Sequence, residues 1–152
     1  MCIKELETLV KGGMKVFDVG TGSGVLAIAA AKLGATDVTA TDYDATAVSV
    51  AEENIRHNHV EHIIKTGRSD LMKQIDGKAD LVIANIIADI VIRLFDELEE
   101  HLNAGGSLLA SGIIGERIAD VTEAALAHGF TIDKVMEAKG WAAMVIHTGA
   151  KQ

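Results

Sequence analysis

The chain has 152 residues and a mass of 16.0 kDa, which predicts a single domain with one sizeable hydrophobic core. Its formal net charge of −8, from 14 basic and 22 acidic residues, argues against direct nucleic-acid binding by clustered Lys and Arg. One cysteine excludes an internal disulfide and no apolar run approaches the roughly 18 residues that cross a bilayer, so we expect a cytoplasmic protein without a membrane segment.

The first elements are a helix, a strand and a glycine-rich turn. Residues 2–10 carry apolar side chains at helical spacing. The apolar strand Val16–Val19 then runs into Gly20-Thr21-Gly22-Ser23-Gly24, and an apolar helix follows over residues 25–31. Glycine adopts positive φ and lets a ligand approach the backbone, and open parallel sheets bind ligands beyond the carboxyl ends of their strands. The turn therefore predicts a ligand site.

The spacing of these glycines selects among nucleotide sites. A dinucleotide fingerprint, G-x-G-x-x-G, would need glycine at Val25, and no Gly-Lys-Ser/Thr follows to make a P-loop. The pattern resembles the first motif of class I methyltransferases, which hold S-adenosylmethionine. A strand-to-helix turn that binds no ligand is the alternative.

An acidic residue at the end of the next strand supports the interpretation that the ligand is a nucleoside. Asp42 follows the strand Val38–Thr41, about 20 residues after the turn, as expected for a carboxylate that accepts ribose hydroxyls. Tyr43 and Asp44 either flank the ribose and adenine, or are a surface aromatic and the N-cap of the following helix.

A short third strand is expected near residues 62–66 and is predicted to be broken by Gly67-Arg68-Ser69-Asp70. In a sheet of this order the loop reaches the adenine side, so Arg68 or Ser69 is a candidate contact, with an ordinary loop as the alternative. The histidines at 57, 59 and 62 do not predict a metal site, because such ligands must converge and need outer-shell support.

Asn85 follows the buried strand 81–84 at its carboxyl end, where a ligand site belongs. Its side-chain oxygen could accept a hydrogen bond from a substrate amine, and the alternative is a helix N-cap. The helix that follows is predicted to run from Ile87 to Leu102 and to end at Gly105-Gly106.

The remaining chain predicts a strand, a helix and a hairpin. The strand covers residues 107–110, the helix includes Ile118, Val121 and Ala125, and the hairpin strands are 130–136 and 141–147 around a turn at 137–140. Alternation of strands and helices predicts an α/β fold, a mostly parallel sheet with helices on both faces.

Taken together, the motifs resemble those of PrmA-type ribosomal protein methyltransferases. The matching segments are Asp18–Ala30, Ala40–Asp42, Ala84–Ala88, Gly105-Gly106, Ser111–Ile114 and Trp141–Ala143. The resemblance implies a Rossmann-like class I fold with seven strands, one of them antiparallel, and S-adenosylmethionine as the cofactor. It also implies a substrate lysine on a ribosomal protein. Residues 1–152 would form the catalytic domain, without the family's N-terminal substrate-recognition domain.

With S-adenosylmethionine as the expected cofactor, we hypothesise the following roles for the candidate residues. Gly20, Thr21, Gly22 and Gly24 form the turn at the methionine and ribose, Asp18 orients that turn or meets the cofactor's ammonium through water, and Asp42 holds the ribose. Tyr43 and Arg68 are further cofactor contacts, and Asn85 binds at the methyl and aligns the target nitrogen.

No general base stands out in the sequence, although Asp89 lies one helical turn past Asn85. Two alternatives remain: methylation of a small-molecule or nucleic-acid nitrogen, and a non-catalytic cofactor-binding module.

Overall fold

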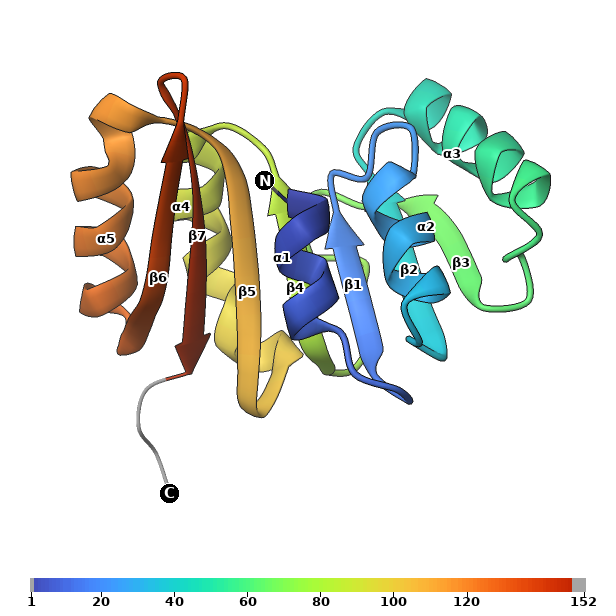
Figure 1. Cartoon of the computed structure of the whole chain (residues 1–152), viewed down its shortest axis with the longest axis horizontal. Helices are drawn as coiled ribbons and strands as arrows, with labels where there is room; N and C mark the ends of the chain where they lie inside the picture. The colour runs from blue at the N-terminus through green and yellow to red at the C-terminus, as the bar shows by residue number, and fades with distance from the viewer. Residues whose placement is uncertain (1, 149–152) are drawn as a thin grey trace.

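The computed structural model describes residues 2–148, which form a seven-stranded sheet with helices on both faces (Figure 1). The strands lie in the order β3-β2-β1-β4-β5-β7-β6, and β7 alone is antiparallel to its neighbours. This confirms the predicted α/β fold and the single antiparallel strand. The strands are β1 Lys15–Val19, β2 Asp37–Asp42, β3 Ile64–Arg68, β4 Ala79–Asn85, β5 Leu102–Ile114, β6 Phe130–Ala138 and β7 Trp141–Thr148; the helices are α1 Cys2–Leu9, α2 Val25–Lys32, α3 Ala45–His57, α4 Ala88–Leu98 and α5 Ile118–Ala127.

Two hydrophobic clusters, one on each face of the sheet, hold the layers together. Alternate residues of a strand point to opposite faces. In β1, Phe17 therefore packs with α4 residues such as Leu94, while Val16 packs with Leu6 of α1 and Ile28 of α2. The alternation explains why buried strands read as continuous apolar runs in the sequence.

The predicted end of the helix before β5 was wrong. The α4 helix stops at Leu98, a short 3₁₀ turn follows, and Leu102 already begins β5. Gly105 and Gly106 belong to an irregular start of β5, where the register against β4 shifts. A Cβ on Gly106 would lie 2.8 Å from the Asn103 carbonyl oxygen, so the glycines permit a strand bulge instead of capping a helix.

Two other boundaries also differ from the prediction. Gly67 and Arg68 do not break β3, because they pair with Thr41 and Asp42 of β2. The hairpin turn shrinks to Lys139 and Gly140, which both have positive φ, as in a tight two-residue turn. In both places backbone pairing with a neighbouring strand outweighs local turn propensity.

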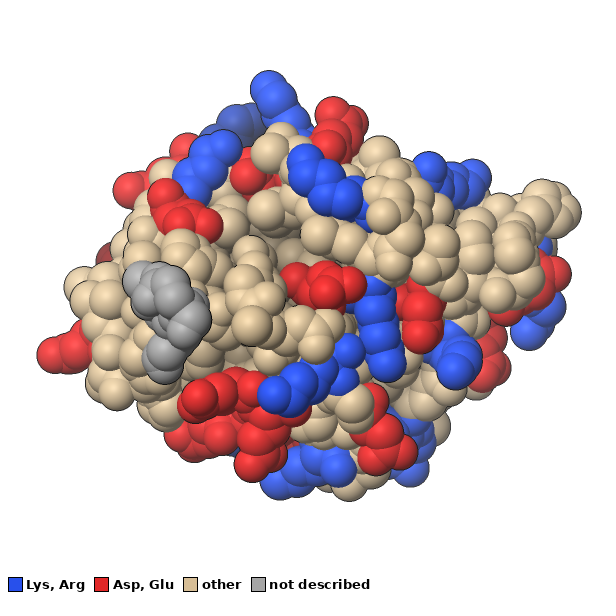
Figure 2. All heavy atoms as spheres, turned by 90° about the horizontal axis from the view of Figure 1, so that it is seen from below, with Lys and Arg blue, Asp and Glu red and all other residues tan. Residues whose placement is uncertain are grey.

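Charged side chains of both signs are intermixed at the lower end of the molecule, opposite the carboxyl ends of the parallel strands (Figure 2). This face therefore presents no broad field of one sign that would attract a phosphate backbone. Within the described residues, no helix is long and apolar enough to span a membrane.

Candidate functional site

A cleft of about 480 Å³ opens where the carboxyl ends of β1, β2 and β4 meet. Strand β1 lies between β2 and β4, so the strand order reverses here, which is the usual place for a ligand in an open parallel sheet. The cleft is lined by Val19, Gly20, Asp42, Tyr43, Ser69, Asp70, Leu71, Ile86, Ile90 and Arg93.

The glycine turn between β1 and α2 reaches this cleft through Gly20. Gly20, Gly22 and Gly24 all have positive φ, at 72°, 59° and 88°. A Cβ on Gly20 would lie 2.7 Å from Ile86 Cγ2, while a Cβ on Gly22 would meet no atom within 4 Å. Gly20 is therefore required by close packing against the segment after β4, and the space beside Gly22 remains open.

Asp42 is tied directly to the turn. Its Oδ2 accepts a 2.9 Å hydrogen bond from the Gly22 amide, and its Oδ1 accepts a 3.0 Å bond from the Asp44 amide. Each carboxylate oxygen has two acceptor sites, so one on each oxygen remains for a ligand. The structure thus fixes an acceptor pair suited to two neighbouring hydroxyls. Asp44 also caps α3 through Thr46, as predicted.

Asp18, in β1, is hydrogen-bonded to the glycine turn. The side chain is buried, and its Oδ2 accepts a 2.7 Å hydrogen bond from the Thr21 hydroxyl. Burial raises the pKa of Asp18 to about 7, and the hydrogen bond from Thr21 opposes this rise. Oδ1 is buried and has no hydrogen-bond partner among the described residues, so it is an unsatisfied polar atom next to the turn.

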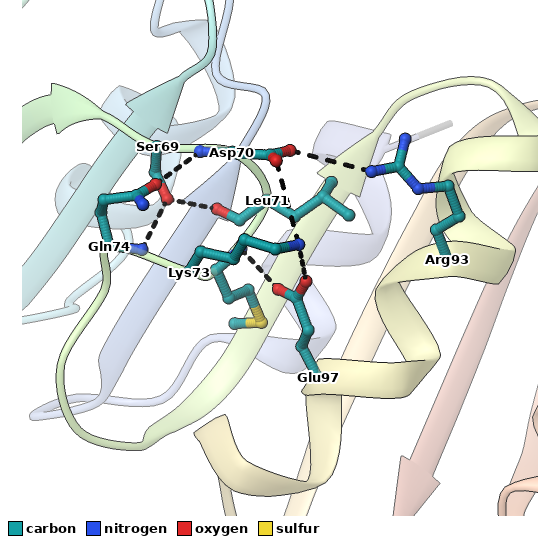
Figure 3. A network of polar contacts seen from close by, with 8 residues as sticks. Ser69, Asp70, Leu71, Lys73, Gln74, Arg93 and Glu97 are labelled. Atoms are coloured by element: carbon teal, nitrogen blue, oxygen red, sulfur yellow. Dashed lines mark hydrogen bonds and ion pairs between the residues drawn. The ribbon is translucent and has the colours of Figure 1, made fainter.

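The outer half of the cleft lies between the loop after β3 and helix α4 (Figure 3). Leu71 and Ile90 supply apolar surface, while Asp70 and Arg93 supply charges at 3.9 Å from each other. Apolar walls with polar rims suit a planar ring that has polar edges.

Sequence reasoning missed Leu71, Ile86, Ile90 and Arg93 as site residues. The sequence did show an apolar helix shortly after Asn85. It could not show that this helix faces the loop after β3, because that contact joins residues far apart in the chain.

Tyr43 and Arg68 lie together at the edge of the site. Tyr43 is 70% exposed and lines the cleft, whereas Arg68 lines a smaller adjoining cavity of about 270 Å³. The Arg68 guanidinium lies 6.0 Å from the centre of the Tyr43 ring, and its Nε donates to the Tyr43 carbonyl. Arg68 therefore positions Tyr43, and its own contact with a cofactor stays a prediction.

Asn85 is the exposed last residue of β4 and does not line the cleft. Ile87 occupies the N-cap position of α4, so the alternative role of Asn85 as a helix cap does not apply. Asn85 lies beside Gly112 of β5, where a Cβ would come within 3.0 Å of Asn85 Oδ1. The side-chain amide thus sits at the carboxyl edge of the sheet next to the cleft segment Ile86.

The described residues also bear on metal ligation and on the candidate base Asp89. Residues 2–148 contain no cluster of three His, Cys, Asp or Glu side chains that could hold a metal ion. Asp89 Oδ1 accepts a 2.7 Å bond from Arg117 Nη2, so the carboxylate that sequence reasoning considered as a base is engaged in an ion pair.

Comparison with protein families gives a match over residues 1–149 to the model described as "Ribosomal protein L11 methyltransferase (PrmA)". Among curated proteins, the chain is 48% identical over 141 residues to a ribosomal protein L11 methyltransferase of Desulfitobacterium hafniense, covering 93% of this chain and 45% of the relative. The corresponding Exiguobacterium protein is 42% identical over 149 residues, covering 98% and 48%. The chain spans about half the length of the curated relatives it matches.

Solved structures show the same similarity. A ribosomal protein L11 methylase from Lactobacillus delbrueckii subsp. bulgaricus superposes with a TM-score of 0.94 at 38% identity, covering 97% of this chain and 77% of that one. A tRNA m1G37 methyltransferase of M. jannaschii has a TM-score of 0.83 at 20% identity, covering 99% and 47%, and shows the shared fold alone.

Proposed function

Because the chain belongs to the ribosomal protein L11 methyltransferase (PrmA) family, we propose that it forms the S-adenosylmethionine-dependent catalytic part of a protein methyltransferase. S-Adenosylmethionine is the methyl donor of class I methyltransferases. The proposed acceptors are amino groups of lysine on a ribosomal protein, in the cytoplasm. The observation that carries the proposal is the hydrogen bond that joins Asp42, a residue lining the cleft, to the glycine turn.

The residues present fit an adenosine group. The remaining acceptor sites of Asp42 suit the ribose hydroxyls, and the apolar slot between Leu71 and Ile90 suits the faces of the adenine ring. The unpaired Oδ1 of Asp18 gives a polar group beside the turn where the methionine portion would lie. Tyr43, an exposed aromatic residue that also lines the cleft, adds a ring at its edge.

When bound, the cofactor supplies a methyl group on a sulfonium, which is electrophilic before any protein group acts on it. The contribution of this chain is therefore to bind, orient and exclude water. Asn85 Oδ1 accepts a hydrogen bond from the incoming amine and directs the nitrogen lone pair toward the cleft. Asp89 is paired with Arg117 and does not take the proton of the substrate amine. Instead, desolvation of the amine in the closed site lowers its pKa, so that it loses its proton before it attacks.

Titration calorimetry on the chain tests the cofactor site. We expect S-adenosylmethionine to bind, NADH not to bind, and Asp42→Ala to weaken S-adenosylmethionine binding about 10- to 100-fold, because hydrogen bonds to a charged group contribute about 1.5–3 kcal/mol. A control at an exposed acid outside the cleft, Glu61→Ala, should bind normally. Failure of S-adenosylmethionine to bind would refute the proposed cofactor.

A transfer assay with ribosomal protein L11 tests the reaction. Radiolabelled methyl should appear on lysine, and Asn85→Ala should reduce the rate with little effect on cofactor binding. If the chain binds the cofactor but labels no ribosomal protein, it is a cofactor-binding unit that depends on other sequence for its substrate.

A further inference from the structure

The loop after β3, residues 69–75, forms part of the cleft wall without being part of a helix or strand. Ser69, Asp70 and Leu71 all line the cleft. Figure 3 shows this 69–75 loop facing α4, with side chains from both segments directed toward one another. The shape of the cleft therefore depends on how this irregular segment is held.

The loop contains a conformation that needs support. Leu71 has a φ of 55°, in the left-handed region that residues with a Cβ disfavour. Within the loop, the Ser69 hydroxyl donates a 2.6 Å bond to the Leu71 carbonyl and accepts a 3.2 Å bond from the Gln74 amide. These bonds shape the loop but do not attach it to the opposite wall of the cleft.

Glu97 of α4 provides that attachment. Its Oε1 accepts a 2.9 Å hydrogen bond from the backbone amide of Met72, the residue directly after Leu71. Its Oε2 accepts a 2.7 Å bond from Lys73 Nζ. The Glu97 side chain is only 18% exposed, and Met72 is fully buried, so these charge-assisted bonds are partly shielded from water.

The neighbouring contact between α4 and the loop is weaker. Arg93 Nη2 lies 3.9 Å from Asp70 Oδ1, and both side chains are about half exposed. Exposed ion pairs at this distance contribute little. Glu97 therefore dominates the polar attachment, and Ile90, seven residues earlier on the same helix face, lines the cleft itself.

We propose that Glu97 is a positioning residue for the cofactor: by holding the Met72 amide it keeps Leu71 and Asp70 against the adenosine cleft. This inference rests on the proposed function. It links cofactor affinity to α4, which begins three residues after Asn85, the residue proposed to bind the acceptor amine.

Calorimetry with S-adenosylmethionine on the whole chain and four variants tests the proposal. Glu97→Ala removes both bonds and should raise Kd about tenfold or more. Glu97→Gln keeps an acceptor for the Met72 amide and should rescue Kd to within about threefold of the unsubstituted chain. Lys73→Met removes only the exposed partner, and Asp96→Ala removes a surface contact to His128 from the same helix, so both should leave Kd unchanged.

The hydrogen-exchange rate of the Met72 amide distinguishes loss of this one contact from a general loss of stability. The Met72 amide should be protected in the unsubstituted chain and in Glu97→Gln, and should exchange faster in Glu97→Ala while core strand amides stay protected. If Glu97→Ala does not fold, Glu97→Asp, whose shorter side chain cannot span both partners, should show the same selective loss.

The outcomes distinguish failure of the proposed function from failure of the proposed role of Glu97. Absence of S-adenosylmethionine binding by the unsubstituted chain overturns the proposed function, and the inference with it. Binding by the unsubstituted chain with an unchanged Kd in folded Glu97→Ala or Glu97→Asp overturns the inference alone. A lowered melting temperature with unchanged Kd would assign Glu97 a structural role only.

Discussion

Asp18 combines full burial with a carboxyl group whose pKa is raised from 3.8 to about 7, chiefly by desolvation. Between these values the unfolded carboxyl is ionised while the folded one keeps its proton, so the folded state binds more protons. The free energy of unfolding should therefore fall as pH rises from about 4 to about 7 and show no further contribution from Asp18 above that.

Asp18→Asn should remove this dependence because the amide is neutral at every pH. The stability of the variant relative to the unsubstituted chain should increase by about 2–3 kcal/mol between pH 5 and pH 8. Urea denaturation at the two pH values measures the difference, and parallel pH profiles for the two proteins would contradict the raised pKa. Asp44→Asn, at an exposed cap, serves as the control.

Single residues of the site differ in how far the sequence could predict them. Asp42 and the glycine turn were predictable because parallel strand ends meet at one edge, and the structure joins them at 2.9 Å. The placement of Leu71 beside Ile90 was not, because it depends on contacts between a loop and a helix that no local pattern encodes.

The element that joins β1 to α2 gives a matched pair of substitutions. Gly20→Ala would place a Cβ 2.7 Å from Ile86 Cγ2 and should destabilise the fold by about 2–4 kcal/mol, from overpacking and positive φ together. It should also push Ile86 into the cleft and weaken cofactor binding. Gly22→Ala meets no neighbour within 4 Å and should cost only about 1 kcal/mol. Equal unfolding midpoints in urea for the two variants would contradict this account.

Helix α1 is fastened to β6 by an ion pair with unequal exposure. Lys134 Nζ lies 3.1 Å from Glu5 Oε1, and the side chains are 54% and 9% exposed. Lys134→Met would leave the Glu5 carboxylate buried without a partner and should destabilise the fold by about 1–2 kcal/mol. The double variant with Glu5→Gln should recover most of this loss, which a double-mutant cycle in urea would measure. Additive effects of the two substitutions would show that the pair contributes nothing.

Elements were predicted best where they are regular. Helix α3 and its cap at Asp44 followed from local pattern alone, since the cap bonds to Thr46 two residues away. The start of β5 was misassigned because Gly105-Gly106 is typical of a helix end, whereas pairing with β4 decided the outcome. Tertiary pairing overrode local propensity in that segment.

Ligand binding should stabilise the whole molecule. A ligand at 100 times its Kd adds about 2.7 kcal/mol to the free energy of unfolding, which for a domain of this size corresponds to about 5–10 °C in melting temperature. S-Adenosylmethionine should produce this shift in a thermal melt, and Asp42→Ala should lose most of it. A shift of equal size in Asp42→Ala would place the ligand outside the described cleft.

The fold class of the whole molecule was predictable because alternating strands and helices allow few arrangements, with short connections and right-handed crossovers. The seven strands, with β7 alone antiparallel, agree with the arrangement expected from the family resemblance. Local patterns left the shape of the cleft open, because part of its wall is an irregular loop that contacts side chains of α4.

Strand β7 is the last in sequence, yet it lies between β5 and β6, which precede it. During synthesis, β6 therefore has no neighbour in the sheet until residue 148 has left the ribosome exit tunnel. Pairing among β5, β7 and β6 should therefore wait until β7 has been synthesised, while β1 to β4 can pair earlier. A released chain that is truncated before Trp141 should resist proteolysis in β1 to β4 and be cleaved within residues 130–138, which have lost their only neighbour in the sheet.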